Sequence, residues 1–204
     1  MDDSHFQSLV RELVSLTRET EWVEFKHNKA VPEEIGEYLS ALSNSAALLG
    51  KPSAYILWGI EDGTRRIIGT TFRPHQKKVG NEELENWLLT QLDPRVLVNI
   101  HEGMVDGNPL VIFEMQPAMN RPVRFKGVAY IRIGSYKKKL QDHPEKEREL
   151  WRKFERTPFE KGLAMDGATS DDILSLIDYP NYFRMMQQPL PENRETILER
   201  LTSE

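Results

Sequence analysis

The chain reads ETEWVEFK over residues 19–26. From Val23 onward apolar and polar side chains alternate, which is the period of a β-strand with one buried face. Val23 and Phe25 then share one face of the strand, and Trp22 and Glu24 share the other. The stretch therefore predicts a strand at residues 21–26, and the segments on either side of it decide what the strand packs against.

Helices are predicted on both sides of this strand. Residues 6–17 place apolar side chains at helical spacing, and Pro32 followed by two acidic residues is a favourable start for a helix that ends before Gly50. A third helix is predicted over 82–92. Further strands are predicted at 54–60, 65–69, 96–101, 110–115 and 128–133. The sequence therefore predicts an α+β fold, with a mixed sheet of about six strands flanked by helices.

The character of the chain changes after residue 141. Residues 142–204 hold 14 acidic and 9 basic residues and account for the whole net charge of −5, because residues 1–141 are neutral. Short helices are predicted over 144–155, 171–178 and 191–201. The sequence thus predicts a domain over 1–141 and an acidic helical segment over 142–204, which we expect to lead to a C-terminal region absent from this chain.

The residues from 116 to 141 contain no Asp or Glu and carry seven basic side chains: Arg121, Arg124, Lys126, Arg132, Lys137, Lys138 and Lys139. One acid-free basic stretch in a neutral body is a plausible footprint for a phosphate backbone. Phe125, Tyr130 and Tyr136 interleave with these cations and could stack on bases. The alternative is a solvated basic surface with no partner.

Composition excludes several classes of site. The chain has no cysteine, which excludes disulfides and thiolate ligands. Its apolar runs are too short to cross a bilayer, and its polar, acidic N-terminus does not resemble a signal peptide. These features predict a cytoplasmic protein with no membrane partner. Glycine-rich nucleotide-binding loops and the Gly-x-Ser-x-Gly elbow are also missing from the sequence.

Three carboxylates could act together. Glu19 and Glu24 flank the start of the first predicted strand, and Asp62 lies in a turn after another. Carboxylates brought together repel one another unless a cation joins them, and oxygen ligands suit Mg²⁺ or Mn²⁺. Such an ion could activate water against a phosphodiester. The alternative is that these are surface carboxylates paired with neighbouring Lys and Arg.

Several motifs, taken in order, resemble the Schlafen AlbA-type domain, formerly described as a divergent AAA domain. The resemblance covers roughly residues 10–140. It rests on ETxxVEFK at 19–26, LSNSA at 42–46, WGIED at 58–62, IIG at 67–69, RPV at 121–123 and YIRIGS at 130–135. One departure is His27-Asn28, where family members often have an acidic residue and Ser.

The resemblance implies two functions. Bacterial members are usually described as DNA-binding domains of transcriptional regulators, and vertebrate relatives include endoribonucleases that cleave tRNA and rRNA with a Glu, Glu, Asp triad. Glu19, Glu24 and Asp62 fall on that pattern. The first hypothesis is therefore a nucleic-acid-binding module, with DNA favoured over RNA. The second is a divalent-metal-dependent endoribonuclease acting on structured RNA. The third reading is a protein-interaction or dimerisation domain with vestigial motifs, for example one that forms a homodimer.

Overall fold

The computed structural model describes residues 1–16, 20–156 and 169–202. The chain forms two compact units, Met1–Thr157 and Pro158–Glu204. None of the helices in the described part of the chain is long and apolar enough to cross a membrane.

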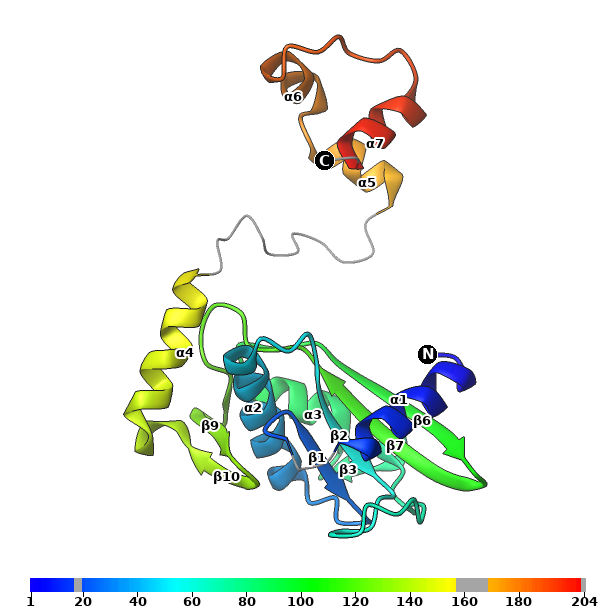
Figure 1. Ribbon diagram of the computed structural model, residues 1–204, viewed down its shortest axis with the longest axis vertical. Helices are drawn as coiled ribbons and strands as arrows, with labels where there is room; N and C mark the ends of the chain where they lie inside the picture. Colours follow the sequence, from blue (N-terminus) through cyan, green and yellow to red (C-terminus); the bar gives the residue numbers. More distant parts are fainter. Residues whose placement is uncertain (17–19, 157–168, 203–204) are drawn as a thin grey trace. The chain divides into compact units, whose positions relative to one another are not determined.

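The first unit is built on a four-stranded sheet in the order β1-β2-β7-β6. The strands are β1 (Val23–Lys26), β2 (Ala54–Trp58), β6 (Val98–Val105) and β7 (Asn108–Met115). β1 runs parallel to β2, and the other pairs are antiparallel. Helix α1 (Asp3–Ser15) lies against this sheet, and α2 (Pro32–Leu49) and α3 (Leu84–Gln91) lie on its other side (Figure 1).

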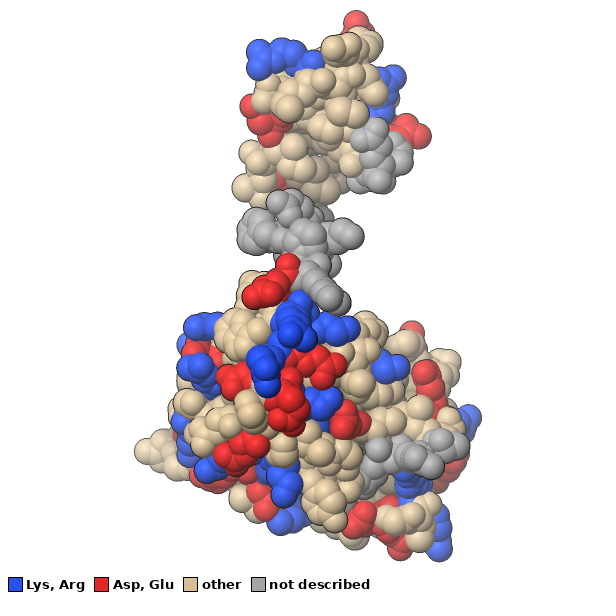
Figure 2. Space-filling view, turned by 60° about the vertical axis from the view of Figure 1, so that its left-hand side comes forward, with Lys and Arg blue, Asp and Glu red and all other residues tan. Residues whose placement is uncertain are grey.

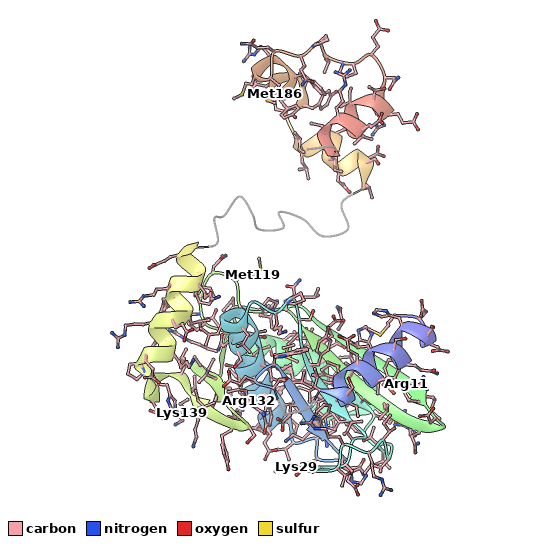
Figure 3. The ribbon with its side chains drawn as sticks, viewed as in Figure 1. Arg11, Lys29, Met119, Arg132, Lys139 and Met186 are labelled. Carbon is pink, nitrogen blue, oxygen red and sulfur yellow. The ribbon has the colours of Figure 1, made fainter. Side chains whose placement is uncertain are left out.

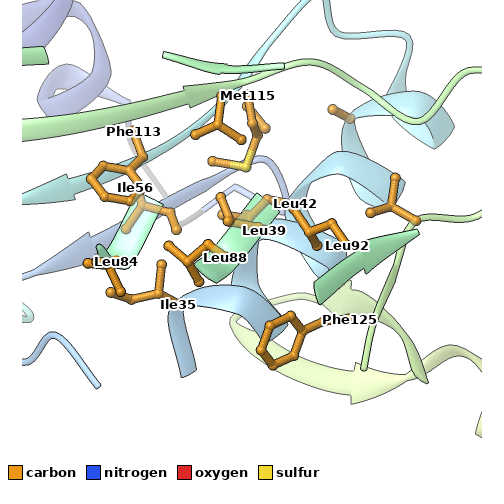
Figure 4. Close-up of a cluster of buried hydrophobic side chains, with 14 of the residues drawn as sticks. Ile35, Leu39, Leu42, Ile56, Leu84, Leu88, Leu92, Phe113, Met115 and Phe125 are labelled. Atoms are coloured by element: carbon orange, nitrogen blue, oxygen red, sulfur yellow. The ribbon is translucent and has the colours of Figure 1, made fainter. Parts of the chain in front are cut away.

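Alternation along the strands divides the core into two clusters. Leu110 and Ile112 of β7 pack with α1, whereas Val111 and Phe113 pack with α2 and α3. Figure 4 shows Phe113 among the side chains of these two helices. Because successive strand residues point to opposite faces, a strand buried on both sides must be apolar at nearly every position, as the central strands are here.

A second sheet lies on the far side of α2, in the order β10-β9-β8-β5. Its strands are β5 (Leu92–Asp93), β8 (Arg124–Phe125), β9 (Val128–Ile133) and β10 (Tyr136–Lys139). Small polar side chains join α2 to this sheet. The Ser40 hydroxyl donates to the carbonyl of Val123 (2.7 Å), and Asn44 bonds to the backbone of Val123 and Tyr130.

The first unit is completed by short elements and one more helix. These are η1 (Pro74–Gln76), β3 (Lys78–Val79), β4 (Glu82–Glu83), η2 (Leu140–Asp142) and α4 (Pro144–Arg156). Helix α4 buries Leu150 against Leu48, Ile131 and Leu140. The compact unit therefore extends beyond the boundary expected at residue 141, because the amphipathic α4 covers apolar side chains of α2 and β9.

The second unit contains α5 (Ser170–Leu176), α6 (Tyr179–Met185) and α7 (Arg194–Thr202). Thr169 caps α5 through a reciprocal pair of hydrogen bonds with Asp172. These bonds lower the pKa of the Asp172 carboxyl. Among its described side chains Phe183 and Ile197 are buried. This unit is the part of the helical segment predicted over 142–204 that follows α4.

The predicted α+β class is confirmed, with helices flanking a mixed sheet. Six strands are at least four residues long, but they belong to two sheets. The predicted strand at 65–69 forms only an isolated bridge between Ile60 and Ile67. The sequence missed β10, because three consecutive lysines do not alternate, and it missed α6, because Pro180 suggested a helix end.

Candidate nucleic-acid interface

Glu24 is the centre of a buried ionic cluster between β1, α2 and β9. Strand β1 places Glu24 and Lys26 on the same face, and the Lys26 ammonium lies 2.5 Å from one carboxylate oxygen of Glu24. The guanidinium of Arg132 donates to the other oxygen. The side chain of Glu24 is 8% exposed and that of Arg132 is fully buried. Both oxygens of Glu24 therefore already have cationic donors.

Tyr38 of α2 lies among the cations of this cluster. The Lys26 ammonium donates to the Tyr38 hydroxyl at 3.3 Å, and the Lys137 ammonium lies 4.4 Å from the centre of the Tyr38 ring. Burial raises the pKa of Tyr38, and the negative charge of Glu24 adds to this effect. Burial alone would lower the pKa of Lys26, but its hydrogen bond and its attraction to Glu24 raise that pKa overall.

Glu37 joins the same cluster to the β9–β10 hairpin. Its carboxylate accepts from the Lys137 ammonium and from the Tyr130 hydroxyl, the latter at 3.1 Å. β9 and β10 pair Arg132 directly with Lys137, so the two cations lie side by side and each needs its own carboxylate. Sequence spacing gave no signal for Glu37 or Tyr38, since neither falls in a motif with chemical meaning.

That Glu19, Glu24 and Asp62 come together stays a prediction. Asp62 is exposed in the turn that follows Ile60, whereas Glu24 is buried, and Glu19 lies outside the described residues. In the described ranges no group of three His, Asp or Glu side chains could hold a metal ion. The donor set around Glu24 is cationic and does not fit Mg²⁺ or Mn²⁺, so we derive no reaction step through a metal.

Four of the seven predicted basic residues are paired with carboxylates from other parts of the chain. Arg132 binds Glu24 and Lys137 binds Glu37. The other two pairs lie at the surface, and they are Arg121 with Asp93 (2.6 Å) and Lys126 with Glu33 (3.6 Å). Figure 2 shows Lys and Arg intermixed with Asp and Glu over one face of the first unit.

The remaining three, Arg124, Lys138 and Lys139, are exposed and have no carboxylate at ion-pair distance within the part of the chain that the structure describes. Figure 3 contrasts Lys139, at the outer edge of the ribbon, with Arg132 beside α2. Tyr136 adds an aromatic ring that is 70% exposed, with the Lys138 ammonium 5.7 Å from its centre. Phe125 and Tyr130 are instead packed against α3 and α2.

The family model for Schlafen, AlbA_2 matches residues 19–141, more than half of the chain. The chain belongs to the Schlafen AlbA_2 family. The match includes both sheets, the α2 segment that joins them and the buried cluster around Glu24. No curated protein is recognisably similar to the chain.

Two solved structures are similar to this family member. One is the crystal structure of the DIP2311 protein from Corynebacterium diphtheriae, with 19% identity and a TM-score of 0.47 over 89% of this chain and 35% of that one. The other is the solution structure of the N-terminal domain of an ATP-dependent DNA helicase RecG-related protein from Nitrosomonas europaea. It has 21% identity and a TM-score of 0.43 over 67% of this chain and 92% of that one. The chain thus spans about a third of the DIP2311 protein.

Proposed function

We propose that this Schlafen AlbA_2 domain binds nucleic acid, with duplex DNA as its preferred ligand, and that it serves as the DNA-binding part of a transcriptional regulator. One observation carries the proposal. Strand β10 presents the exposed ring of Tyr136 with the exposed Lys138 on the same face, its ammonium 5.7 Å from the ring centre, and a second exposed lysine, Lys139, on the opposite face. No carboxylate among the described residues lies at ion-pair distance from either lysine. Unpaired cations contact phosphates, and an exposed ring beside them can stack on a base.

The buried cluster supports this surface without contacting the ligand. Arg132 and Lys137 belong to the same basic stretch, but their charges are held by Glu24 and Glu37. They fix the β9–β10 hairpin against α2. The ligand-binding set that we propose is therefore Arg124, Lys138 and Lys139 with Tyr136, and Arg121 and Lys126 can join it only by leaving their carboxylate partners.

Binding can be measured by fluorescence anisotropy with labelled duplex DNA and single-stranded RNA over a range of salt concentrations. We expect the double variant Lys138→Ala/Lys139→Ala to bind at least about tenfold more weakly, because it loses two charge-assisted contacts. The slope of log affinity against log salt should fall by about 2, since each phosphate contact contributes about 0.9 on duplex DNA.

Arg11→Ala is the matched control. Arg11 is also exposed, but it is already paired with Asp106 at 3.2 Å. Its loss should leave the affinity and the salt slope unchanged. Equal effects of the control and the lysine variant would mean that only overall charge matters, and affinity independent of salt would overturn the proposal.

The endoribonuclease alternative stays a prediction, and a cleavage assay tests it. Labelled tRNA and single-stranded RNA are incubated with Mn²⁺ or with EDTA and examined for fragments. Fragments that need Mn²⁺ and disappear in Asp62→Ala would establish a nuclease. Intact RNA under both conditions would leave binding as the function of the domain.

A further inference from the structure

The chain has a second acid-free basic stretch, over residues 63–81, and it lies on a different part of the fold. It carries five basic residues and His75 but no Asp or Glu: Arg65, Arg66, Arg73, Lys77 and Lys78. It connects the turn after Ile60 to strand β4 through η1 and β3. This stretch lines an open pocket at the surface.

The pocket has a volume of about 270 Å³ and lies between residues 28–30, which follow β1, and the segment 71–77. Its polar lining consists of Asn28, Thr71, Arg73, Gln76 and Lys77. Every one of these side chains can donate a hydrogen bond, and two are cations. No carboxylate lines it. Such a lining suits an anion and disfavours a cation.

Two of the donors, Asn28 and Arg73, are held in place by hydrogen bonds within the fold. The Asn28 side-chain oxygen accepts from the hydroxyl of Thr70 (2.8 Å) and from the backbone N–H of Thr71 (2.8 Å), which fixes the orientation of the amide. One terminal nitrogen of Arg73 donates to the carbonyls of Thr70 and Phe72. The rest of the guanidinium fork keeps its donors for a ligand. Little ordering is then needed when an anion enters.

The floor of the pocket belongs to the core. Phe72 is buried, with its ring 4.9 Å from that of Trp58 and 6.2 Å from that of Phe113. Trp58 in turn donates to the carbonyl of Lys29 at 2.9 Å, so both walls of the pocket are attached to β2. A pocket anchored in this way keeps its shape without a ligand.

No carboxylate among the described residues neutralises the two cations of this pocket. Arg73 and Lys77 have no carboxylate at ion-pair distance in the described ranges, unlike four of the seven cations of the β9–β10 stretch. The volume lies just below the roughly 300–1,000 Å³ of pockets for drug-sized ligands. It therefore suits one phosphate group with part of its sugar.

We propose that this pocket, formed by Asn28, Thr71, Arg73, Gln76 and Lys77, binds the phosphate group of a nucleic acid or nucleotide. The proposal deepens the proposed function and rests on it only for the source of the phosphate. Arg73 supplies the planar fork that matches phosphate oxygens, Lys77 supplies a second charge, and the side-chain amides of Asn28 and Gln76 complete the set of donors. The Thr71 hydroxyl already donates to the Asn28 side-chain oxygen at 3.2 Å, so it helps to orient that amide.

The test uses the full chain labelled with ¹⁵N and followed by NMR at constant ionic strength. Inorganic phosphate, a nucleoside 5′-monophosphate and duplex DNA are titrated separately, with chloride as the reference salt. We expect saturable shifts of the Asn28 and Gln76 side-chain amides and of the Thr71 backbone amide. The variant Arg73→Ala/Lys77→Ala should weaken phosphate binding at least about tenfold, since two charge-assisted contacts are lost.

Two further variants keep the result interpretable. Lys77→Glu changes one exposed side chain and leaves the Arg73 hydrogen bonds in place, so loss of phosphate binding in this variant is not a folding effect. Lys138→Ala/Lys139→Ala should weaken DNA binding and leave inorganic phosphate binding unchanged. Shifts that do not saturate, or that survive both pocket variants, would overturn the proposal.

The separate titrations with phosphate, monophosphate and duplex DNA distinguish the pocket proposal from the proposed nucleic-acid function. Phosphate binding in the pocket together with competition by duplex DNA supports both. Phosphate or monophosphate binding without any DNA binding would retain the pocket as a site for a free phosphorylated ligand and overturn the nucleic-acid function. DNA binding that is insensitive to the pocket variants would overturn the pocket as part of the DNA surface.

Discussion

Replacing Asn44 by Ala should destabilise the first unit more than the small size of the Asn44 side chain suggests. Asn44 is fully buried in α2, where its amide donates to the carbonyls of Val123 (2.9 Å) and Tyr130 (2.8 Å). Its oxygen accepts from the backbone N–H of Val123 at 2.8 Å. One side chain thus satisfies the backbone of the segment that connects the two sheets.

The expected decrease in the free energy of unfolding follows from these contacts. The carbonyl of Val123 keeps its bond from Ser40, but the Val123 N–H and the Tyr130 carbonyl lose the partner that Asn44 provides. Each buried group left unsatisfied costs about 1–3 kcal/mol, which gives about 4 kcal/mol for the two. That is a large part of the roughly 5–15 kcal/mol that stabilises a typical domain.

Urea unfolding followed by tryptophan fluorescence measures this cost. All four tryptophans lie in the first unit, so the signal reports on that unit alone. With a urea dependence of about 2 kcal/mol per M, the midpoint of Asn44→Ala should fall by about 2 M. Asn44→Asp should be at least as damaging, because a carboxylate cannot donate to the two carbonyls.

The neighbouring Ser43→Ala is the matched control. Ser43 is equally buried in the same helix, but its hydroxyl has no hydrogen-bond partner among the described residues. Removing an unsatisfied polar group should stabilise the unit or change its stability by less than about 1 kcal/mol. If the Asn44 and Ser43 variants unfold at the same urea concentration, the hydrogen bonds of Asn44 do not hold the sheets together as argued.

Two other predictions concern the buried cluster. Arg132→Met leaves the carboxylate of Glu24 buried with one cation fewer and should cost about 3–5 kcal/mol in urea unfolding, and Glu24→Gln in the same chain should recover part of the loss. The folded-state pKa of Tyr38 is raised above its usual value of 10.0, so its contribution to stability is complete below about pH 10 and is lost as the pH rises through the folded value. As the pH rises above 10, the free energy of unfolding of Tyr38→Phe, measured with urea, should therefore fall by less than that of the native chain. Equal falls in the two chains would contradict this.

The sequence predicted the first sheet and its helices well because these elements follow simple periods. The strand at Val23–Lys26 alternates, and α2 starts at Pro32 and ends before Gly50 as expected. Prediction failed where an element depends on contacts from far along the chain. The lysines of β10 form a strand because they pair with β9, and α4 joins the first unit because Leu150 finds a cluster on α2 and β9.

The nucleic-acid-binding residues were harder to predict from the sequence, because carboxylates far away along the chain neutralise some of the cations. A count along the chain showed seven cations without an acid, but it could not show which acids lie beside them in space. Glu24 and Glu37 come from about 100 residues earlier in the chain. They neutralise Arg132 and Lys137, the two members of the stretch that face α2. The motif LSNSA likewise gave no hint that Asn44 bonds to strand backbones.

The two basic stretches differ in how many of their cations are paired with a carboxylate. The stretch over 116–141 has more cations, yet in the described structure four are paired and those that remain lie on an open surface. The stretch over 63–81 has fewer, but Arg73 and Lys77 line an open pocket without a carboxylate. An anion is attracted by charge that is unneutralised and gathered in one hollow, and basic residues that already have partners add little. The shorter stretch is therefore the better place for a discrete phosphate, and the longer one for a diffuse contact with a backbone.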